Sequence, residues 1–179
     1  MELTGRIRVV QADITTLETD AIVNAANSAL LPGGGVDGAI RRAAGNELNE
    51  HLSRIAKCPT GTAVITPGYR LPARHVIHTV APIWSRGDGE QDALLASCYD
   101  GVLALADRYQ IRTLAFPAIG TGAFGWPSDV AAHIALKLTT AHLKQCAIEH
   151  VVTLCCFTPS DLAAYRKLLD GFFTCHGRV

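Results

Sequence analysis

Runs of apolar, mostly β-branched residues recur along the chain and predict buried strands. Within these runs the apolar residues stand next to one another rather than on alternate positions. That pattern is typical of strands covered on both faces, as in a parallel sheet. The predicted strands lie at residues 7–10, 21–23, 63–66, 75–80, 113–116 and 150–157.

Longer segments between the later runs repeat apolar residues every three or four positions, which predicts helices with one buried stripe. The first stripe is Leu95, Tyr99, Val102 and Ala106, the second is Val130, Ile134, Leu138 and Ala141, and the third is Leu162, Tyr165, Leu169 and Phe172. Pro127 and Pro159 suit the first turns of the second and third helices, because a backbone N–H is not needed there.

Two shorter helices are predicted at residues 36–44 and 46–57, separated by Gly45, which we expect to end the first with left-handed backbone. Strands and helices therefore alternate over most of the length. This order predicts the α/β class, with a largely parallel central sheet covered on both faces. Ligands of such folds bind beyond the carboxyl ends of the strands.

The composition fits one compact domain. A chain of 179 residues, 49% hydrophobic and 18% charged, can bury one core but not comfortably two, so we expect a single domain over residues 1–179. Sixteen basic residues balance sixteen acidic ones, which argues against nucleic acid as a partner. No apolar run approaches the roughly 18 residues of a membrane helix, and the first residues show no targeting pattern, so we expect a cytoplasmic protein without membrane contact.

Cysteines and histidines predict neither disulfides nor a metal site. The six cysteines form no C-x-x-C pair and mostly stand among apolar neighbours, where a reduced thiol packs like a small hydrophobic residue. The seven histidines form no H-E-x-x-H motif, and no His/Cys cluster at metal spacing is evident. We therefore expect no bound metal and no cofactor.

Two glycine-rich segments each match the pattern G-x-G-x-x-G. In a dinucleotide-binding fold the first glycine directly follows a strand, and the helix begins inside the motif. The first segment starts ten residues after the run at 21–23, and Trp126 with Pro127 delays the helix beyond the second, so neither predicts an NAD site. A nucleoside-triphosphatase loop, G-x-x-x-x-G-K-[ST], is absent. The two sets are Gly33, Gly35 and Gly38, and Gly120, Gly122 and Gly125.

Successive glycines let backbone N–H groups turn toward an anion and let a phosphate approach without meeting a Cβ. Two such loops would clamp a diphosphate from both sides. The competing interpretation is two tight turns without a ligand. In that case each glycine lowers the stability of the fold by roughly 0.5–1 kcal/mol through lost conformational entropy, and no packing contact compensates for it. We favour ligand binding.

Four segments, in order and spacing, give the chain its resemblance to a known family. They are VVQADI, DAIVNAANSALLPGGGVDGAIRRAAG, CPTGTAVITPGYRLPARHVIHTVAPIW and AFPAIGTGAFGWP. The sequence closely resembles the MacroD-type macrodomains over nearly its whole length. This resemblance implies a three-layer α/β/α macrodomain with a mixed, largely parallel central sheet and a cleft for ADP-ribose at the strand ends.

The activity that the resemblance implies is hydrolysis of ADP-ribose esters without a metal. Members of the family deacetylate O-acetyl-ADP-ribose and remove mono-ADP-ribose from acidic side chains of proteins. The implied partners are ADP-ribose, O-acetyl-ADP-ribose and mono-ADP-ribosylated proteins, and we expect a monomer. A non-catalytic module that reads ADP-ribose is the alternative, and an RNA-binding regulator is disfavoured by the neutral charge.

The resemblance also implies ligand-binding residues. Taken alone, Asp13 would be interpreted as an acidic residue in a turn. By the resemblance, Asp13 accepts a hydrogen bond from the adenine amino group, and Ile14 offers a neighbouring backbone contact. Phe124 packs against the terminal ribose. The glycine-rich contacts to the distal ribose and the diphosphate are Gly33, Gly34, Gly35 and Val36 on one side, and Gly120, Thr121, Gly122 and Ala123 on the other.

Asn27 and Asp37 are the catalytic residues that the resemblance implies, while Asn24 is structural. The amide of Asn27 fixes the ribose, and Asp37 either takes a proton from water or only orients it. A helix N-terminus lowers the pKa of an aspartate, whereas bound phosphates and closure of the cleft raise it, so both roles stay open.

Five positions depart from the usual family pattern. Ala12, Pro32 and Ala81 stand where glycine is common, and Pro32 stiffens the entry to the first loop. Gly120 and Ala123 give the second loop a more flexible start and a smaller apolar contact. These departures concern affinity and rate rather than the identity of the ligand.

Overall fold

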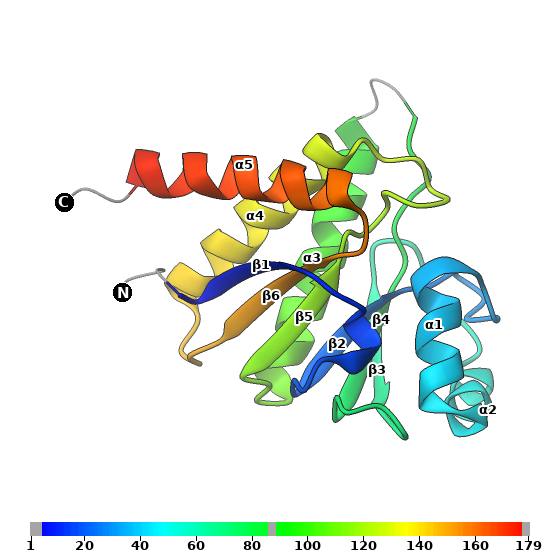
Figure 1. The fold of residues 1–179 in the computed structure, drawn as a ribbon. Helices are drawn as coiled ribbons and strands as arrows, with labels where there is room; N and C mark the ends of the chain where they lie inside the picture. The colour runs from blue at the N-terminus through cyan, green and yellow to red at the C-terminus, as the bar shows by residue number, and fades with distance from the viewer. Residues whose placement is uncertain (1–4, 86–88, 177–179) are drawn as a thin grey trace.

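The computed structural model describes residues 5–85 and 89–176, with the backbone alone for residues 172–176 (Figure 1). Every predicted strand is present, with ends shifted by at most two residues. The strands are β1 (Ile7–Gln11), β2 (Ala21–Ala25), β3 (Ala63–Pro67), β4 (His75–Thr79), β5 (Thr113–Pro117) and β6 (Val151–Cys156). The helices are the 3₁₀ turn η1 (Ile14–Thr16), α1 (Gly35–Ala44), α2 (Asn46–Ile55), α3 (Gly89–Arg108), α4 (Ser128–Gln145) and α5 (Pro159–His176).

One mixed sheet carries the described strands in the order β1-β6-β5-β2-β4-β3. All neighbours pair in parallel except β3, which runs antiparallel to β4 with Ile65 opposite Ile77. The predicted mixed, largely parallel sheet is therefore confirmed. Because β2, β4, β5 and β6 are parallel, the loops that follow them all emerge at one edge of the sheet, which we call the carboxyl edge.

Helices cover both faces of this sheet and make three layers. Neighbouring residues of a strand point to opposite faces, so adjacent residues of β2 belong to different apolar clusters. Val23 lies in a cluster with Tyr99 of α3 and Phe116 of β5. Ile22 lies in a second cluster with Ile40 of α1. Figure 1 shows α3, α4 and α5 on one side, and α1 with α2 beside the end of the sheet formed by β2, β4 and β3.

The predicted stripe of α4 is wrong in part. Ala141 is exposed, and Val130 and Leu138 are only half-buried. α4 packs against both α3 and α5, so its small residues are covered on two sides, and alanine allows the close approach. The buried residues of α4 are Ala131, Ala132, Ile134, Ala135, Leu136, Thr139 and Leu143.

Helix ends also differ from expectation at three places. Pro127 lies just before α4 rather than in its first turn, whereas Pro159 is the first residue of α5 as predicted. α2 stops at Ile55, because Ala56 adopts φ 69°. Gly45 ends α1 with φ 91°, but its ψ of 178° lies outside the left-handed helical region. Of the third predicted stripe, the side chain of Phe172 lies outside the described residues.

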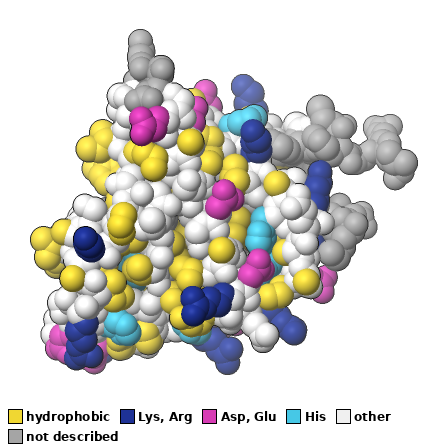
Figure 2. Space-filling model, turned by 180° about the vertical axis from the view of Figure 1, so that it is seen from behind, with side chains coloured by type: hydrophobic (Ala, Val, Ile, Leu, Met, Phe, Trp, Pro, Cys, Tyr) yellow, Lys and Arg dark blue, Asp and Glu magenta, His cyan; other side chains and the backbone are white. Residues whose placement is uncertain are grey.

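Charged and apolar side chains are interspersed on the face seen in Figure 2. No helix in the described part of the chain is long and apolar enough to cross a membrane. Among the residues whose side chains the structure describes, five large apolar side chains are exposed; Tyr69 and Tyr109 are 39% and 47% exposed, whereas Leu31, Ile83 and Phe157 are all more than 60% exposed. Each of the last three belongs to a loop that follows β2, β4 or β6, so all three lie at the carboxyl edge, where exposed apolar surface is typical of contact with another molecule.

The β3–β4 turn supplies a test of this architecture. The Gly68 N–H donates to the carbonyl oxygen of Arg74 at 2.7 Å, and a Cβ on Gly68 would overlap the carbonyl oxygen of Ala73. We expect Gly68→Ala to lower the free energy of unfolding by about 1–3 kcal/mol, measured by urea unfolding, because the turn must open.

Gly101→Ala is the matched control. A Cβ there would meet Ala63 at an ordinary 3.6 Å inside α3, so the same change is expected to gain about 0.5–1 kcal/mol through helix propensity. A Gly68→Ala protein as stable as the parent would contradict the close approach in the turn.

Candidate functional site

The two glycine-rich loops lie next to each other because β2 and β5 are neighbours. Ala21 and Ile22 pair with Leu114 and Ala115. We call residues 26–34, which follow β2, the first loop, and residues 118–127, which follow β5, the second loop. The fold therefore brings together two segments that are about ninety residues apart in the sequence.

Asp37 lies in the first turn of α1 and is only 3% exposed. Its Oδ2 accepts hydrogen bonds from the Gly33 N–H at 2.7 Å and from Arg41 Nε at 2.8 Å. Its Oδ1 accepts a third from Asn24 Nδ2 at 2.7 Å. One carboxylate thus joins the first loop, α1 and the end of β2.

Arg41 completes this buried ion pair. Besides Asp37, its guanidinium binds the Asn49 side chain at 2.5 Å and the carbonyl oxygen of Leu30 at 2.8 Å. The side chains of Asp37 and Arg41 are 4% and 6% exposed. Removing one member of a buried pair typically costs about 3–5 kcal/mol, because the other charge is left without compensation. The ion pair therefore fixes how the first loop leaves the sheet.

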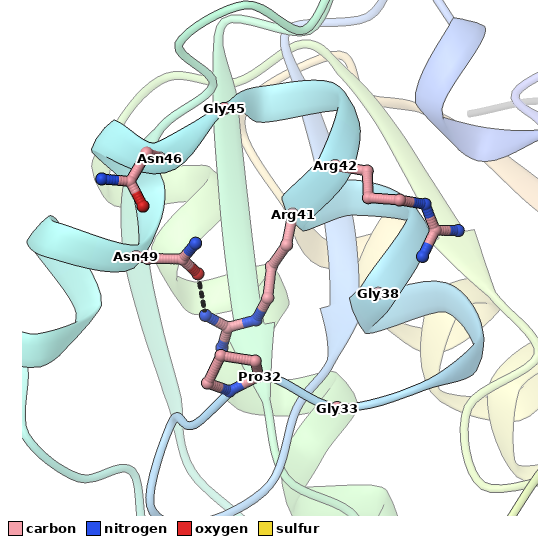
Figure 3. Close-up of a pocket in the computed structure, with 8 residues that line it drawn as sticks. All are labelled: Pro32, Gly33, Gly38, Arg41, Arg42, Gly45, Asn46 and Asn49. Carbon is pink, nitrogen blue, oxygen red and sulfur yellow. Dashed lines mark hydrogen bonds between the residues drawn. The ribbon is translucent and has the colours of Figure 1, made fainter.

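A cavity of about 440 Å³ lies beside this ion pair (Figure 3). Pro32, Gly33 and Gly38 line it together with Arg41 and Arg42, and Figure 3 shows the Arg41 guanidinium directed toward Asn49. The guanidinium is engaged in the hydrogen bonds already described. Arg41 thus supports the first loop from this side.

Behind Asp37, a chain of polar groups runs into the sheet. Asn24 Nδ2 lies 3.0 Å from His78 Nδ1, and His78 Nε2 lies 3.0 Å from Thr66 Oγ1. Since an amide NH₂ only donates, His78 Nδ1 accepts and Nε2–H donates to Thr66. Burial lowers the pKa of His78 to about 3, against the opposing effect of the Asp37 charge, so the ring is neutral. Asn24 is fully buried and holds the carboxylate, as expected of a structural residue.

Asn27 shapes the first loop through its side-chain amide. Its Nδ2 donates to the Leu31 carbonyl oxygen at 2.6 Å, and its Oδ1 accepts from the Leu31 N–H at 3.1 Å. Asn27 and Asp37 make no direct hydrogen bond to each other. A Cβ on Gly33 would meet Asp37 Oδ2 at 3.3 Å and Asn27 Nδ2 at 3.8 Å, so the two predicted catalytic side chains flank Gly33.

The helix after the first glycine motif begins close to where the sequence predicted it. α1 begins at Gly35, inside the motif and one residue before the predicted start, while β2 ends at Ala25, well before Gly33. A Cβ on Gly38 would lie 2.9 Å from the Gly33 carbonyl oxygen, so only glycine lets α1 approach the loop this closely. Val36, in the first turn of α1, packs against the second apolar cluster.

In the second loop, two glycines adopt backbone that other residues avoid. Gly120 has φ 88° and Gly125 has φ 73°, and the Trp126 N–H donates to the Gly120 carbonyl oxygen at 3.1 Å. A Cβ on Gly120 would meet the Trp126 ring at 2.6 Å. Thr121 Oγ1 donates to Ala118, so its hydroxyl supports the turn. α4 starts only at Ser128, which confirms that the second motif ends before its helix.

Two tryptophans anchor the second loop, a role that the sequence pattern did not predict for either. Trp126 Nε1 donates to the Pro82 carbonyl oxygen at 2.8 Å, and its ring lies 4.7 Å from that of Trp84. The Trp84 N–H in turn donates to the Phe124 carbonyl oxygen at 2.8 Å. The Phe124 side chain is half-buried against the first apolar cluster. Gly122 and Ala123, at the tip, are exposed.

Asp13 and Phe157 lie together beyond the paired ends of β1 and β6, where Gln11 is opposite Cys156. Asp13 Oδ1 accepts from the Thr15 hydroxyl at 2.7 Å and from its N–H at 2.9 Å, and these bonds lower the pKa of Asp13. The side chain of Ile14 is buried in the second apolar cluster. Phe157, predicted to lie within a strand, instead follows it and is 80% exposed. In the sequence, the only indication that Phe157 could belong to the site was that an aromatic residue stands at the end of a predicted strand.

A separate cluster contradicts the expectation that no histidines and cysteines stand at metal spacing. Among the described residues, His142, Cys146 and His150 have donor atoms within 4.8 Å of one another. They are spaced four residues apart, which places the first two on one face of a helix. The cluster lies at the end of α4 and before β6, away from the carboxyl edge.

Comparisons with known proteins agree with this geometry. The profile of the Macro domain family matches residues 23–135. A macro domain-containing protein of Ralstonia nicotianae is 53% identical over 93% of this chain and 96% of its own length. A protein of Escherichia fergusonii named O-acetyl-ADP-ribose deacetylase is 46% identical over 92% of this chain and 96% of its own.

Solved structures extend the similarity to three dimensions. The Oceanobacillus iheyensis macrodomain with ADP has a TM-score of 0.89 and 39% identity, covering 93% of this chain and 91% of that one. The Trypanosoma brucei macrodomain in complex with ADP-ribose has a TM-score of 0.86 and 38% identity, covering 92% of this chain and 69% of that one.

His78 gives a pH-dependent prediction. Its pKa falls from 6.5 in the unfolded chain to about 3 in the folded protein, so below pH 6.5 the unfolded state binds the extra proton. Stability is therefore complete above pH 6.5 and declines as the pH falls toward 3. Between pH 6.5 and 5, this residue should contribute a slope of up to about 1.4 kcal/mol per pH unit in urea unfolding. His78→Gln should remove that contribution.

His133→Gln, at an exposed position of α4, controls for replacement of a histidine as such. The quantity to compare is the slope of the unfolding free energy against pH, not its absolute value. Identical slopes for the parent and His78→Gln would show that His78 does not stay neutral in the fold.

Proposed function

Because the chain belongs to the Macro domain family, we propose that it binds ADP-ribose at the carboxyl edge and hydrolyses ADP-ribose esters. Its substrates are O-acetyl-ADP-ribose and proteins that carry mono-ADP-ribose on acidic side chains. The relative from Escherichia fergusonii and another from Salmonella newport, 44% identical, are named O-acetyl-ADP-ribose deacetylase. The observation that carries the proposal is the buried Asp37 carboxylate, held beneath a glycine loop that faces a second one.

The strand order supports one direction for the ligand. Adenine lies at the ends of β1 and β6, between the Asp13 carboxylate and the exposed ring of Phe157. The diphosphate lies between the first and second loops, whose glycines leave backbone N–H groups accessible. The terminal ribose reaches Asn27 and Phe124. From β1 to β2 there are three strand spacings, or about 14 Å, which suits an extended nucleotide.

Within this arrangement, Asp37 orients rather than abstracts. Three protein donors fix the positions of its two oxygens, and Oδ1, which accepts only from Asn24, has a further lone pair that can hold a water in place. Asn27 holds Leu31 in the same way. The two side chains therefore set the shape of the first loop, which positions the ester and a water. A phosphate oxygen of the substrate then accepts the proton of that water.

The alternative is a reader that binds ADP-ribose without cleaving it. Asn27 and Asp37 flank the same glycine and also shape the first loop, so a reader would use them as well. The two relatives named O-acetyl-ADP-ribose deacetylase favour the hydrolase over the reader.

The proposal predicts that Asn27→Ala and Asp37→Asn each lower kcat for O-acetyl-ADP-ribose by about 100-fold, the usual result of misplacing reacting groups by about 1 Å. Acetate and ADP-ribose release should be followed by chromatography, and ADP-ribose affinity by calorimetry. Asp37→Asn also disturbs the pair with Arg41, so melting temperature is measured alongside. The same variants should fail on a protein ADP-ribosylated on glutamate.

Asp129→Asn is the matched control, since Asp129 is an exposed aspartate in the first turn of α4 and should keep full activity. Tight ADP-ribose binding by the wild type without turnover of either substrate would favour the reader. Folded Asn27→Ala and Asp37→Asn proteins with undiminished kcat would show that neither side chain positions the ester or the water.

A further inference from the structure

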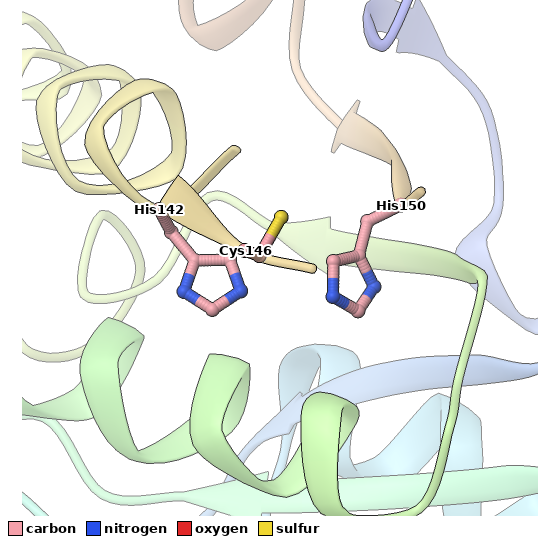
Figure 4. Close-up of side chains that lie close together, drawn as sticks. All are labelled: His142, Cys146 and His150. Carbon is pink, nitrogen blue, oxygen red and sulfur yellow. The ribbon is translucent and has the colours of Figure 1, made fainter. Parts of the chain in front are cut away.

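Figure 4 shows the side chains of His142, Cys146 and His150 close together. They lie by the start of β6, at the edge of the sheet opposite the glycine loops, which follow the ends of β2 and β5. His142 and Cys146 belong to the end of α4, and His150 directly precedes β6. A carboxylate from another helix joins them: Asp107, in the last turn of α3, lies 2.7 Å from His150 and 3.5 Å from His142. Four side chains with metal-binding atoms thus converge from the end of α3, the end of α4 and the residue before β6.

The spacing of the donor atoms is close to that of a metal site. The three His/Cys donor atoms lie within 4.8 Å of one another. Around a tetrahedral zinc ion, with bonds of about 2.0–2.3 Å, such atoms are separated by roughly 3.3–3.6 Å. Closing this gap requires shifts of about 1 Å, which the half-buried His142 and Cys146 can make while the fully buried His150 stays in place.

His150 is already oriented as a ligand. Its Nδ1–H donates a hydrogen bond to the Ile111 carbonyl oxygen, with 2.7 Å between the two heavy atoms. Its Nε2 faces an Asp107 oxygen at 2.7 Å, so both ring nitrogens face acceptors and a neutral ring satisfies only one of them. A proton between Nε2 and the carboxylate satisfies the other at this distance, and a metal ion does so once the two atoms separate to roughly 3.3 Å. A histidine held by a backbone carbonyl in this way is typical of metal sites.

His142 provides a second, independent observation. Its Nε2 is buried yet makes no hydrogen bond to any group in the described part of the chain. Its ring centroid lies 5.4 Å from that of His150. Its neighbour Asp107 Oδ2 lies 3.5 Å away, beyond a good hydrogen bond. A buried nitrogen without a hydrogen-bond partner costs free energy, and a metal ion bound at this nitrogen removes that cost.

The surrounding charges suit a divalent cation with one thiolate. Arg6 Nη2 lies 3.7 Å from Cys146 Sγ, so the guanidinium is in direct contact with the sulfur of this cluster. Arg6 also donates to the carbonyl oxygens of Leu143 and His150, which fixes the segment that carries the ligands. The Cys146 thiolate and the Asp107 carboxylate together neutralise a 2+ ion, and the thiol proton passes to solvent.

We propose that His142, Cys146 and His150 bind a zinc ion, with Asp107 as the fourth ligand. Two imidazoles, a thiolate and a carboxylate form a donor set that zinc prefers in tetrahedral geometry. Since four side chains fill the coordination sphere, the site is structural. It joins the end of α3 to the turn between α4 and β6, and it is independent of the hydrolysis proposed at the carboxyl edge.

Zinc titration of the full-length chain, after treatment with a chelator, tests this site. Competition with a chromophoric zinc indicator should show one zinc ion per chain, and the melting temperature should rise with zinc concentration. Cobalt in place of zinc should give a sulfur-to-metal charge-transfer band. Cys146→Ser and His142→Gln should weaken zinc binding at least about tenfold. His133→Gln, on the same helix, and Cys155→Ser should bind zinc like the parent.

Cys146→His keeps a ligand at the same position and should retain zinc while losing the charge-transfer band, whether or not Cys146→Ser folds normally. Absence of zinc uptake by the wild type would overturn the site, leaving Asp107 and His150 as an ion pair only. Equal zinc affinity in Cys146→Ser and the controls, or a cobalt complex of the wild type without the sulfur band, would overturn it as well.

Discussion

The buried ion pair between Asp37 and Arg41 is the constraint on which the carboxyl edge depends. A carboxylate at the start of a helix is favoured by the helix dipole, but one that is 3% exposed also needs donors. Those donors come from the first loop, from β2 and from α1 itself. The same charge therefore sets the angle of α1, the path of the glycines and the orientation of Asn24. Asn24 is bonded to His78 as well, and Arg41 to Asn49 and Leu30, so the site is tied into the elements around it.

The second loop solves a similar problem with aromatic rings. The Trp126 ring lies against Gly120, donates a hydrogen bond to a backbone carbonyl oxygen and packs against Trp84. These contacts fix the base of the loop, while the glycines at its tip are exposed. One loop is thus anchored by charge and the other by packing. Because β2 and β5 are adjacent, both face the same space, and the spacing of the loops follows from the sheet rather than from the loops.

The strands and their order along the chain were predictable, because runs of consecutive β-branched residues are typical of strands buried on both faces. The mixed sheet was predicted from the family resemblance. The stripe of α4 was not, because alanines score weakly as apolar residues and yet pack closely between two helices. Asn27, Asp37 and the glycines were found through their motif. Phe157, Trp84 and the chain from Asn24 to Thr66 were not, because their partners come from distant strands that only the folded sheet brings together. Likewise, His142 and His150 meet Asp107 only through the packing of α3 beside α4.

The two faces of the sheet are covered unequally. α1 and α2 contain ten residues each, whereas α3, α4 and α5 contain eighteen to twenty. The two apolar clusters are separate, so the thinner layer can open while the thicker one stays closed. Backbone amides of α1 and α2 should then exchange with deuterium sooner than those of α3. A nucleotide held at the start of α1 would slow that exchange from one end of the layer.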